Sequence, residues 1–577
     1  MNIISSGFIH PVIGIITGLT LIFGCELVGR FFVKRFDQNF FFLNLSFGII
    51  TVSYVTYISV FLGIYKYLDF FISYSILCLG IYEIIYIIKK KNLNIKLNFY
   101  LYFVFFYLFI LFILSISAPT MADALDYHLG VPNYINNHKQ LPNPIFWPSS
   151  TLIGLGEIFN TLGLKVYSDI AGSLLQFIGL LSFLFYFHEN ILNKSKYILF
   201  SLFILGSPVL IFFISGAKHQ LFPQLIMALI LYFLVMTKKI ELKLSFLIIF
   251  LICGVANFKL NFLITGFVLS ILLLLKVKIN YRFIFLCLVC VIIFFFPKAI
   301  FNFYNAEDFT YTNFFTLAPE YFLEGLKNFR ETNFIFPIGL FIPISVGSIT
   351  TILGFQFLIF FFIGSFYENY KKQIIQIIVV SIASGILLFI FAQKIGRIYH
   401  EILLYFSLII IFTNKFKLHV NILKKFLLIN IFPSILVSLF GFILLSSSLI
   451  SNKKRQEVMR AHAAEFNGAE WINKNIHSGE VILTDLRSIA FLDSTPIIIN
   501  NDFKNNQMFL DYIKNNIINY IVLKNFTSKE NYFFKNCDIK IVKKSPEFLK
   551  ETRNIFNQNQ KYIIYILEFK NIKKSCL

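Results

Sequence analysis

The sequence predicts a polytopic α-helical membrane protein of about 12–14 transmembrane helices, followed by a small α/β domain outside the membrane. Of the 577 residues, 57% are hydrophobic and only 14% are charged, and 75 are phenylalanine. No soluble domain needs that much apolar surface, so most of the chain must be dissolved in lipid. The long apolar runs end near residue 450, where short apolar segments begin to alternate with polar stretches.

The apolar runs give the order of the helices, because a membrane-spanning helix needs about 20 mostly apolar residues. The first run has no small-residue cleavage site and is followed by further spans, so we expect a retained helix rather than a signal peptide. Runs that meet or nearly meet the required length are 8–32, 40–63, 69–88, 99–117, 168–188, 196–215, 219–237, 243–257, 260–275, 283–301, 338–364, 374–392, 398–413 and 426–449.

Basic residues collect in every second connection between these runs, and the positive-inside rule places such connections in the cytoplasm. The N-terminus, the loops 118–168 and 302–335, the turn at Arg397 and everything after residue 450 are then expected outside. The formal charge of +21 is thereby an orientation signal, and we expect no nucleic-acid partner. The basic clusters are Arg30 with Lys34 and Arg35, Lys89–Lys91 with Lys96, Lys194 with Lys196, Lys238 with Lys239 and Lys243, Lys276 with Lys278 and Arg282, Lys371 with Lys372, and Lys415 with Lys417, Lys424 and Lys425.

The first large outer loop carries the most concentrated polar cluster, with Asp123, Asp126, Tyr127 and His128 just beyond the run 99–117. Such a cluster beyond a membrane helix is where chemistry at a membrane surface would sit. The apolar residues further along the loop, Trp147 among them, are expected to lie in segments at headgroup depth. A structural alternative is that Asp123 caps a helix and its neighbours are ordinary interface residues.

The segment after residue 450 alternates short β-like runs with helix-like stretches, which is typical of a small α/β domain. One helix is expected over 456–475, with Trp471 on its apolar face. Gly468 and Gly479 stand alone, so no phosphate-binding glycine loop is present, and we expect a supporting or acceptor-binding role. Pairing of Cys537 with Cys576 is left open. The expected strands are 481–483, 496–499, 520–523, 539–542 and 562–569.

The motif Asp123–Leu129, together with several later segments, resembles the bacterial membrane glycosyltransferases of the C-type (GT-C) fold, in particular the protein O-mannosyltransferase and aminoarabinose transferase group. The resemblance covers residues 99–500 and implies a catalytic region at 99–450, an added helical module at 1–98 and an outer domain at 451–577. It also implies the bacterial cytoplasmic membrane as location. The matching elements are Asp123-Ala-Leu-Asp126-Tyr127-His128-Leu129 with Pro148 and Glu157, then Val255-Ala-Asn-Phe-Lys259, then Gln393-Lys-Ile-Gly-Arg397-Ile-Tyr399, and Ala469-Glu-Trp471.

The resemblance implies a sugar donor linked to polyprenyl phosphate and an acceptor that is a glycan, a lipid or a protein. A phosphate leaves readily, so the reaction needs a carboxylate to take the acceptor's proton and cations to hold the phosphate. Asp123 fits the base, with Asp126 as a less secure second catalytic residue. Arg397 suits the phosphate because a guanidinium grips it with two hydrogen bonds. Secondary phosphate-binding candidates are Lys218, Lys259 and Lys394, and Lys259 is equally well explained as a snorkelling interface residue.

Two conformations of the motif separate its polar residues in different ways. A helix places Asp123 and Asp126 on one face and His128 away from both, whereas an extended segment pairs Asp126 with His128. Neither gathers all three, which argues against a simple Asp-Asp-His metal site. No cofactor is certain, and a divalent metal held by Asp123, His128 and Glu157 stays open.

Two other functions compete with sugar transfer. A transporter or flippase of lipid-linked or polar solutes would carry ionisable residues or broken helices at mid-membrane, related by an internal repeat. Only Glu26, Glu83 and Glu401 lie well inside apolar runs, and the run lengths show no repeat. A polysaccharide polymerase or ligase usually has its long loop late in the chain, whereas the longest loop here is early. The gathering of acids in an outer loop favours surface chemistry on a lipid-linked substrate.

Overall fold

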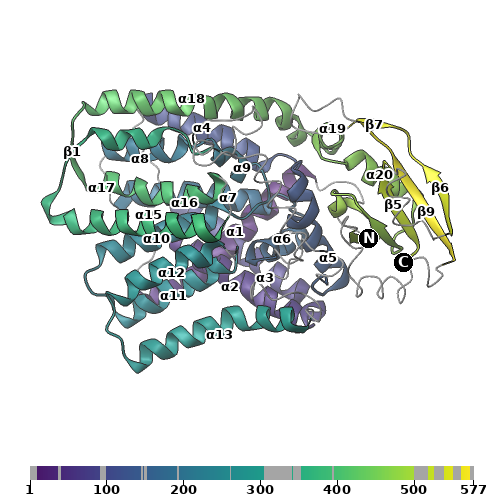
Figure 1. The fold of residues 1–577 in the computed structure, drawn as a ribbon, viewed down its shortest axis with the longest axis horizontal. Coiled ribbons are helices and arrows are strands. Elements are labelled where there is room, and N and C mark those ends of the chain that lie inside the picture. The colour runs from purple at the N-terminus through teal and green to yellow at the C-terminus, as the bar shows by residue number, and fades with distance from the viewer. Residues whose placement is uncertain are drawn as a thin grey trace.

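Long helices run side by side along the length of the computed structural model, and a small sheet domain lies at one end of them (Figure 1). In lipid every backbone polar group must be satisfied within the protein, so the apolar runs form helices. The structure describes residues 10–36, 40–90, 99–143, 147, 153–190, 194–259, 261–304, 341, 352–392, 396–498, 518–525, 538–549, 551 and 561–571.

The helical part has these elements in chain order: α1 (Pro11–Val33), η1 (Lys34–Phe36), α2 (Phe41–Phe61), α3 (Tyr65–Lys90), α4 (Phe99–Ile116), η2 (Ala124–His128), α5 (Gly130–His138), α6 (Leu155–Lys165), α7 (Ala171–Asn190), α8 (Lys194–Leu205), α9 (Val209–Ile214), α10 (Leu221–Met236), α11 (Leu242–Ala256), α12 (Asn261–Leu274), α13 (Tyr281–Tyr304), η6 (Gln356–Phe362), η7 (Glu368–Tyr370), α15 (Lys371–Phe391), α16 (Gly396–Ser407), α17 (Ile409–Phe412), α18 (Val420–Leu445) and η8 (Ser446–Leu449). A two-stranded ribbon of β1 (Ile363–Phe366) and β2 (Thr413–Phe416) joins them.

The predicted fold class is confirmed. Within the described residues, 8 helices are long and apolar enough to cross a membrane, and four further apolar helices are shorter. The run 196–215 differs from the prediction because it is divided into α8 and α9 at Gly206-Ser207-Pro208. Proline has no N–H to donate and disfavours a helical conformation in the residue before it. Residues 338–340 and 342–351 of the expected span 338–364, the loop 302–335 beyond Tyr304, and Cys537 and Cys576 lie outside the described residues.

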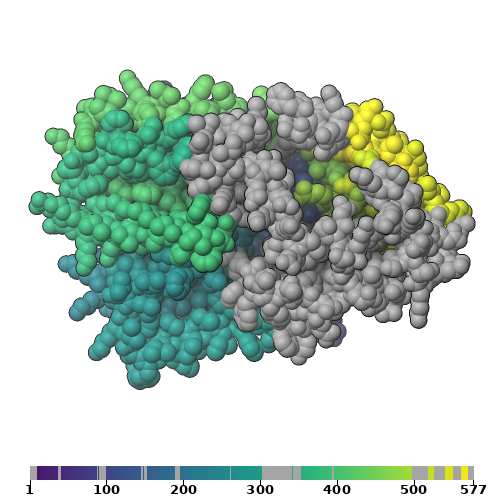
Figure 2. Space-filling view, viewed as in Figure 1, coloured from purple at the N-terminus to yellow at the C-terminus, as the bar shows by residue number. Residues whose placement is uncertain are grey.

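The basic connections gather at the end of the bundle away from the sheet domain, where Figure 1 shows β1. There β1 pairs with β2, the Lys196 ammonium donates to the Ile411 carbonyl oxygen at 3.2 Å, and Lys276 donates to Thr237 O at 3.1 Å. Figure 2 shows the teal and green helices forming this end and the yellow strands lying at the other. Connections that the charge pattern assigns to one side of the membrane thus share one end of the bundle.

Helices α1, α2 and α3 pack closely through small residues. A Cβ at Gly29 would lie 1.8 Å from the carbonyl oxygen of Asn44, so only glycine permits this approach of α1 to α2. Arg30 links two buried acids, with 2.5 Å from Nη2 to Glu26 and a further contact to Glu83. Such interfaces are typical of membrane helices, where close packing and internal polar contacts replace the hydrophobic effect.

The outer domain contains a five-stranded sheet in the order β4-β3-β5-β9-β6. Strand β3 is parallel to both β4 and β5, and β9 is antiparallel to β5 and β6. All five strands were predicted. The domain's elements are α19 (Asn452–His462), α20 (Phe466–Asn475), β3 (Val481–Thr484), η9 (Ile489–Phe491), β4 (Thr495–Ile498), β5 (Tyr520–Lys524), β6 (Asp538–Lys544), β7 (Phe548–Leu549), β8 (Lys561–Tyr562) and β9 (Ile564–Asn571).

Two expectations about local structure were wrong. The single helix over 456–475 is two helices, because Glu465 adopts a left-handed conformation with a φ of 62° and ends the continuous turn. Trp147 does not present its ring to lipid headgroups but is covered by protein at 2% exposure, and Leu155 and Ile158 of α6 are covered in the same way, at 3% and 0%. Helix α6 packs against α2, α5 and α7, so its apolar residues are covered by protein.

Several contacts fix the outer domain on the bundle. Arg455 of α19 is 1% exposed and its Nη2 lies 2.6 Å from the Asp169 carboxylate, in the connection between α6 and α7. The Ala118 amide donates to Ser448 Oγ at 3.1 Å, and the Asn133 side chain donates to Ala490 O at 3.3 Å. A buried guanidinium is tolerated only with its counter-charge, so the Arg455–Asp169 pair holds the domain in place.

We predict that Asp169→Asn lowers the free energy of unfolding by about 3 kcal/mol, because it leaves the Arg455 charge buried without compensation. The measurement is thermal unfolding of the purified protein in detergent. The control is Glu470→Gln, which breaks an exposed pair with Arg460 and should cost less than about 1 kcal/mol. Equal effects of the two substitutions would contradict a docking role for the buried pair.

Candidate active site

The motif that begins at Asp123 forms one turn of π-helix, η2. The Leu129 amide donates to the Ala124 carbonyl oxygen at 2.9 Å, five residues back. Such single wide turns are frequent at functional sites. The helical alternative for the motif is the one observed: Asp123 and Asp126 both approach Arg487, whereas His128 is buried elsewhere.

Asp123 is held between two cations from distant parts of the chain. Its Oδ2 accepts a hydrogen bond from the Lys218 ammonium, and its Oδ1 lies 2.7 Å from Nη2 of Arg487. Lys218 holds the pKa of the Asp123 carboxyl well below its usual range, and Arg487 adds to this effect against the opposing influence of burial. Asp123 is therefore a carboxylate at any physiological pH.

Asp126 has a different environment three residues on. Its carboxylate accepts a hydrogen bond from Trp147 Nε1 at 3.4 Å and lies 4.0 Å from Arg487. Burial raises its pKa to about 7, although Arg487 opposes the shift. The two aspartates therefore carry different charge, with Asp123 ionised and Asp126 close to half-protonated at neutral pH.

Lys218 and Arg397 meet over one aromatic ring. Lys218 Nζ lies 4.4 Å from the ring centroid of Phe212, and the Arg397 guanidinium carbon lies 5.3 Å from it. Gln220 and Gln224 both donate to the Arg397 carbonyl oxygen, at 3.2 and 2.9 Å. Burial lowers the pKa of Lys218 to about 7 despite the neighbouring Asp123. An incoming anion would therefore raise the pKa of Lys218 and favour its charged ammonium form. It would also meet the guanidinium of Arg397, which already carries its charge.

His128 and Glu157 form a separate buried pair. His128 Nδ1 donates to Glu157 Oε1 at 2.6 Å, and the other carboxylate oxygen accepts from the Gly154 amide at 2.7 Å. Burial lowers the pKa of His128 to about 4, so the imidazole is neutral. Glu157 caps the N-terminal end of α6 through its bond to the Gly154 amide. In the part of the chain that the structure describes, no group of three His, Cys, Asp or Glu side chains could hold a metal. The candidate metal set of Asp123, His128 and Glu157 is therefore not assembled.

The remaining sequence candidates are near but make fewer contacts. Lys259 is half-buried between α11 and α12, and burial lowers its pKa to about 8 while Glu157 opposes the shift. Tyr127 is partly buried and its ring centroid lies 4.0 Å from that of His128. Lys394 and Pro148 lie outside the described residues.

A cavity of about 260 Å³ opens beside Asp123, between the helical bundle and the outer domain. The wall on the bundle side includes Asp123, Lys218 and Phe212. The wall on the outer-domain side includes His462 and Glu551, and burial raises the pKa of Glu551. The cavity is lined by Thr120, Met121, Ala122, Asp123, Phe212, Lys218, His462, Ala464 and Glu551.

Sequence reasoning missed the outer-domain half of this site. Arg487, His462 and Glu551 lie in a segment without a recognised binding motif. Arg487 is 364 positions from Asp123, so no local spacing could have indicated the contact. The one available signal was the change of composition after residue 450, which marked a domain without saying which of its edges faces the bundle.

Fold and site together define a polytopic membrane protein whose polar cavity lies where the helices meet a docked α/β domain. The chain belongs to the DUF1420 family: the family described as DUF1420 N-terminal domain matches residues 73–459. No curated protein matches the chain significantly. Two solved structures are similar to it. ArnT from Cupriavidus metallidurans bound to undecaprenyl phosphate has a TM-score of 0.48 and 8% identity, covering 81% of this chain and 97% of that chain. The apo state of the same protein has a TM-score of 0.46, with the same identity and coverage.

Asp126 gives the site a pH dependence that can be measured. Between the ordinary value of 3.8 and about 7, the folded state binds more protons than the unfolded state. The free energy of unfolding therefore falls as pH rises through this window. Asp126→Asn should remove this dependence, a difference on the order of 3 kcal/mol between pH 4 and pH 8. Melting temperatures in detergent across that range test it, with Glu470→Gln as control. An unchanged slope in Asp126→Asn would exclude the buried, protonated state.

Proposed function

We propose that this protein transfers a sugar from a polyprenyl-phosphate-linked donor to an acceptor at the outer face of the bacterial cytoplasmic membrane. The observation that supports it most is one ionised carboxylate, Asp123, beside a cavity and surrounded by cations. Lys218 and Arg487 contact it directly, and Arg397 lies over the same aromatic ring as Lys218. A base next to a cationic anion site is what transfer from a phosphate leaving group requires.

The position of the site suits a lipid-borne donor. Asp123 follows the end of α4 and Lys218 precedes α10, so both side chains lie where apolar helices reach a polar surface. A second cavity of about 480 Å³ is lined by apolar residues of α11, α12, α13 and α15, next to the connection that carries Lys259. A polyprenyl chain would fit such a lining, and its phosphate would then bind Lys259, Lys218 and Arg397. Apolar burial of each CH₂ would contribute about 0.8 kcal/mol.

The proposed reaction is a single displacement. The acceptor's oxygen or nitrogen forms a bond to the anomeric carbon, and the bond from that carbon to the phosphate oxygen breaks. The electron pair leaves with the polyprenyl phosphate, whose charge Arg397, Lys218 and Lys259 stabilise. The acceptor's proton passes to Asp123. One displacement inverts the anomeric configuration, and no strong acid is needed because phosphate is a good leaving group.

Donor binding would also strengthen the base. Asp123 is a weak base while two cations hold it, because they stabilise its charged form. A donor phosphate that engages Lys218 shares the positive charge now directed at Asp123. The pKa of Asp123 then rises toward the working pH, which favours proton transfer.

The alternative is a transporter or flippase. Its charged side chains would face a path along the helices. The described intramembrane cluster of Glu26, Arg30 and Glu83 instead makes its contacts among α1, α2 and α3, with Asn44 of α2 donating to Glu26 at 2.9 Å. The polar groups around the cavity beside Asp123 lie at the end of the bundle, which favours surface chemistry over passage.

We predict that Asp123→Asn lowers the rate of sugar transfer by about 10²-fold or more, because the amide cannot accept the acceptor's proton. The measurement is release of polyprenyl phosphate from a panel of polyprenyl-phosphate sugars by proteoliposomes. Glu470→Gln is the matched control for an acidic-to-amide change and should keep parental activity. Parental rates in Asp123→Asn, with normal insertion, would remove the proposed mechanism. Movement of intact donor across the bilayer without its consumption would favour the flippase.

We predict that Arg397→Ala raises the donor concentration for half-maximal rate by about tenfold, since it removes a charge-assisted contact worth about 1.5 kcal/mol. The same release assay, with donor titrated at saturating acceptor, measures the change. Arg460→Ala, on an exposed pair of the outer domain, is the control. A donor requirement unchanged from the parent would place the phosphate away from Arg397.

A further inference from the structure

The outer domain presents a binding edge to the bundle. Strands β4 and β5 lie on opposite sides of β3 and parallel to it, so the chain leaves β3 in one direction and returns on the other side. In open sheets of this kind, polar ligands bind beyond the carboxyl end of the strand where the order reverses. Strand β3 ends at Thr484, and the residues that follow are Asp485-Leu486-Arg487-Ser488.

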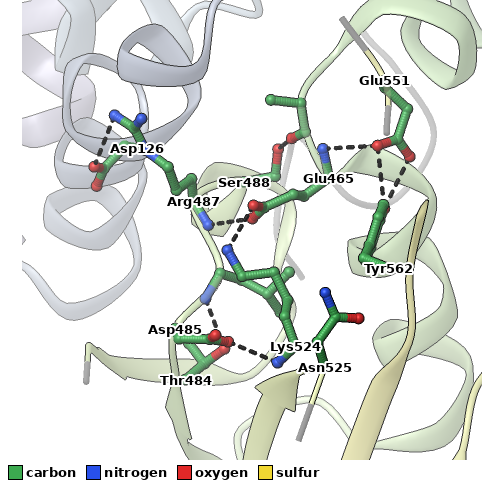
Figure 3. A network of polar contacts seen from close by, with 12 residues as sticks. Asp126, Glu465, Thr484, Asp485, Arg487, Ser488, Lys524, Asn525, Glu551 and Tyr562 are labelled. Carbon is green, nitrogen blue, oxygen red and sulfur yellow. Dashed lines mark hydrogen bonds and ion pairs between the residues drawn. The ribbon is translucent and has the colours of Figure 1, made fainter. Parts of the chain in front are cut away.

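A network of charges fixes this loop, as Figure 3 shows. The backbone amide of Arg487 donates to Glu465 Oε2 at 2.6 Å, and Lys524, at the end of β5, binds Glu465 Oε1 at 2.6 Å. The Lys524 amide donates to Asp485 Oδ1 at 3.0 Å. The loop backbone is therefore held by Glu465, while the Arg487 side chain itself is not used to hold it.

The Arg487 side chain points out of its domain toward the bundle. Figure 3 shows its guanidinium beside Asp126. Only Nη2 makes the contacts, at 2.7 Å to Asp123 and 4.0 Å to Asp126. The side chain is 49% exposed, and among the described residues Nε and Nη1 have no partner. A guanidinium carries five N–H donors, so most of its binding capacity is open to a ligand.

We propose that Arg487 is a donor-binding residue: its guanidinium grips the phosphate of the lipid donor and releases Asp123 when it does so. The proposal rests on the proposed function and adds a residue from a separate domain to the site. Arg487 and Lys218 hold different oxygens of the Asp123 carboxylate: Arg487 binds Oδ1 and Lys218 binds Oδ2. A phosphate beside Asp123 would thus lie within reach of a cation from the bundle and a cation from the outer domain. The Oδ1 atom, freed from Arg487, would then accept the acceptor's proton.

The neighbouring charges favour this exchange. Among the described acids, Asp123 is the one that both cations contact directly, whereas Glu157 faces His128 and Glu465 faces Lys524. The guanidinium fork matches a phosphate more closely than the single nitrogen it now gives to Asp123. The outer domain therefore does more than support the bundle or hold an acceptor: the donor site is complete only while it is docked.

The test uses the full-length protein in detergent with Trp471→Phe as background. Trp147 is then the one tryptophan of the chain, and it reports on the site because its indole contacts Asp126. Polyprenyl phosphate, polyprenol and inorganic phosphate are titrated separately, with Trp147 fluorescence and ligand-induced thermal stabilisation as two readouts. The variants are Arg487→Gln, Arg487→Lys and, as control for an outer-domain arginine in an exposed pair, Arg460→Gln.

Arg487→Gln should weaken polyprenyl phosphate binding about tenfold or more and leave polyprenol binding unchanged. Arg487→Lys should weaken it less, because an ammonium keeps the charge but not the fork, and Arg460→Gln should match the parent. Weakening of inorganic phosphate binding in parallel would show that the contact is to phosphate itself. If Arg487→Gln does not purify folded, the Arg487→Lys titration decides the matter.

Parental affinity for polyprenyl phosphate in Arg487→Gln would overturn the inference. If turnover fell in that variant without a change in affinity, Arg487 would be a residue that only positions Asp123. The proposed function would survive either result, provided that Lys218→Gln still weakened binding. If the parent itself showed no response to polyprenyl phosphate in both readouts, the proposed function would fail instead.

Discussion

The contact of Asp123 with Lys218 and Arg487 is the interaction on which the arrangement of the site depends. It joins the π-helical turn after α4, the connection before α10 and the loop after β3, so one carboxylate connects two regions of the bundle with the outer domain. Other residues hold the two cations in place: Arg487 is held by an acid that is itself paired with Lys524, and Lys218 by an uncharged aromatic ring. The Arg487 backbone is fixed by Glu465, and Lys218 lies over Phe212. The charge of Asp123 is thereby stabilised by the same cations for which the proposed donor phosphate would compete.

Burial explains why two aspartates three residues apart differ in chemistry. Asp123 has a cation at each oxygen, and this compensates for its loss of water. Asp126 has one weak indole bond and a more distant guanidinium, so its charged form is penalised and its pKa rises to about 7. The same rule separates His128 from both: it is buried against Glu157 and stays neutral. Within the motif, Asp123 is therefore charged, Asp126 titrates near neutral pH, and His128 forms a structural pair with Glu157.

The docking of the outer domain has the same physical basis. Arg455 is buried against Asp169, and a buried charge without its partner is costly. Because Arg487 belongs to the domain that this pair holds, the geometry at Asp123 depends on a contact made elsewhere in the molecule. A cavity formed between two regions is also a frequent place for ligand binding.

The sequence by itself determined the helical membrane class, the grouping of basic connections at one end, the strands of the outer domain, and Asp123 as the residue to examine. The helices, connections and strands follow from local composition and periodicity, which lipid and backbone hydrogen bonding translate directly into structure. Asp123 was singled out by its polar cluster after a membrane helix and by the family resemblance of its motif. Only the tertiary structure decided that the run 196–215 is broken, that Trp147 is buried, that His128 pairs with Glu157 and that Arg487 reaches Asp123. Each of these depends on which distant surfaces pack together, and a contact across 364 positions leaves no periodic trace in the chain.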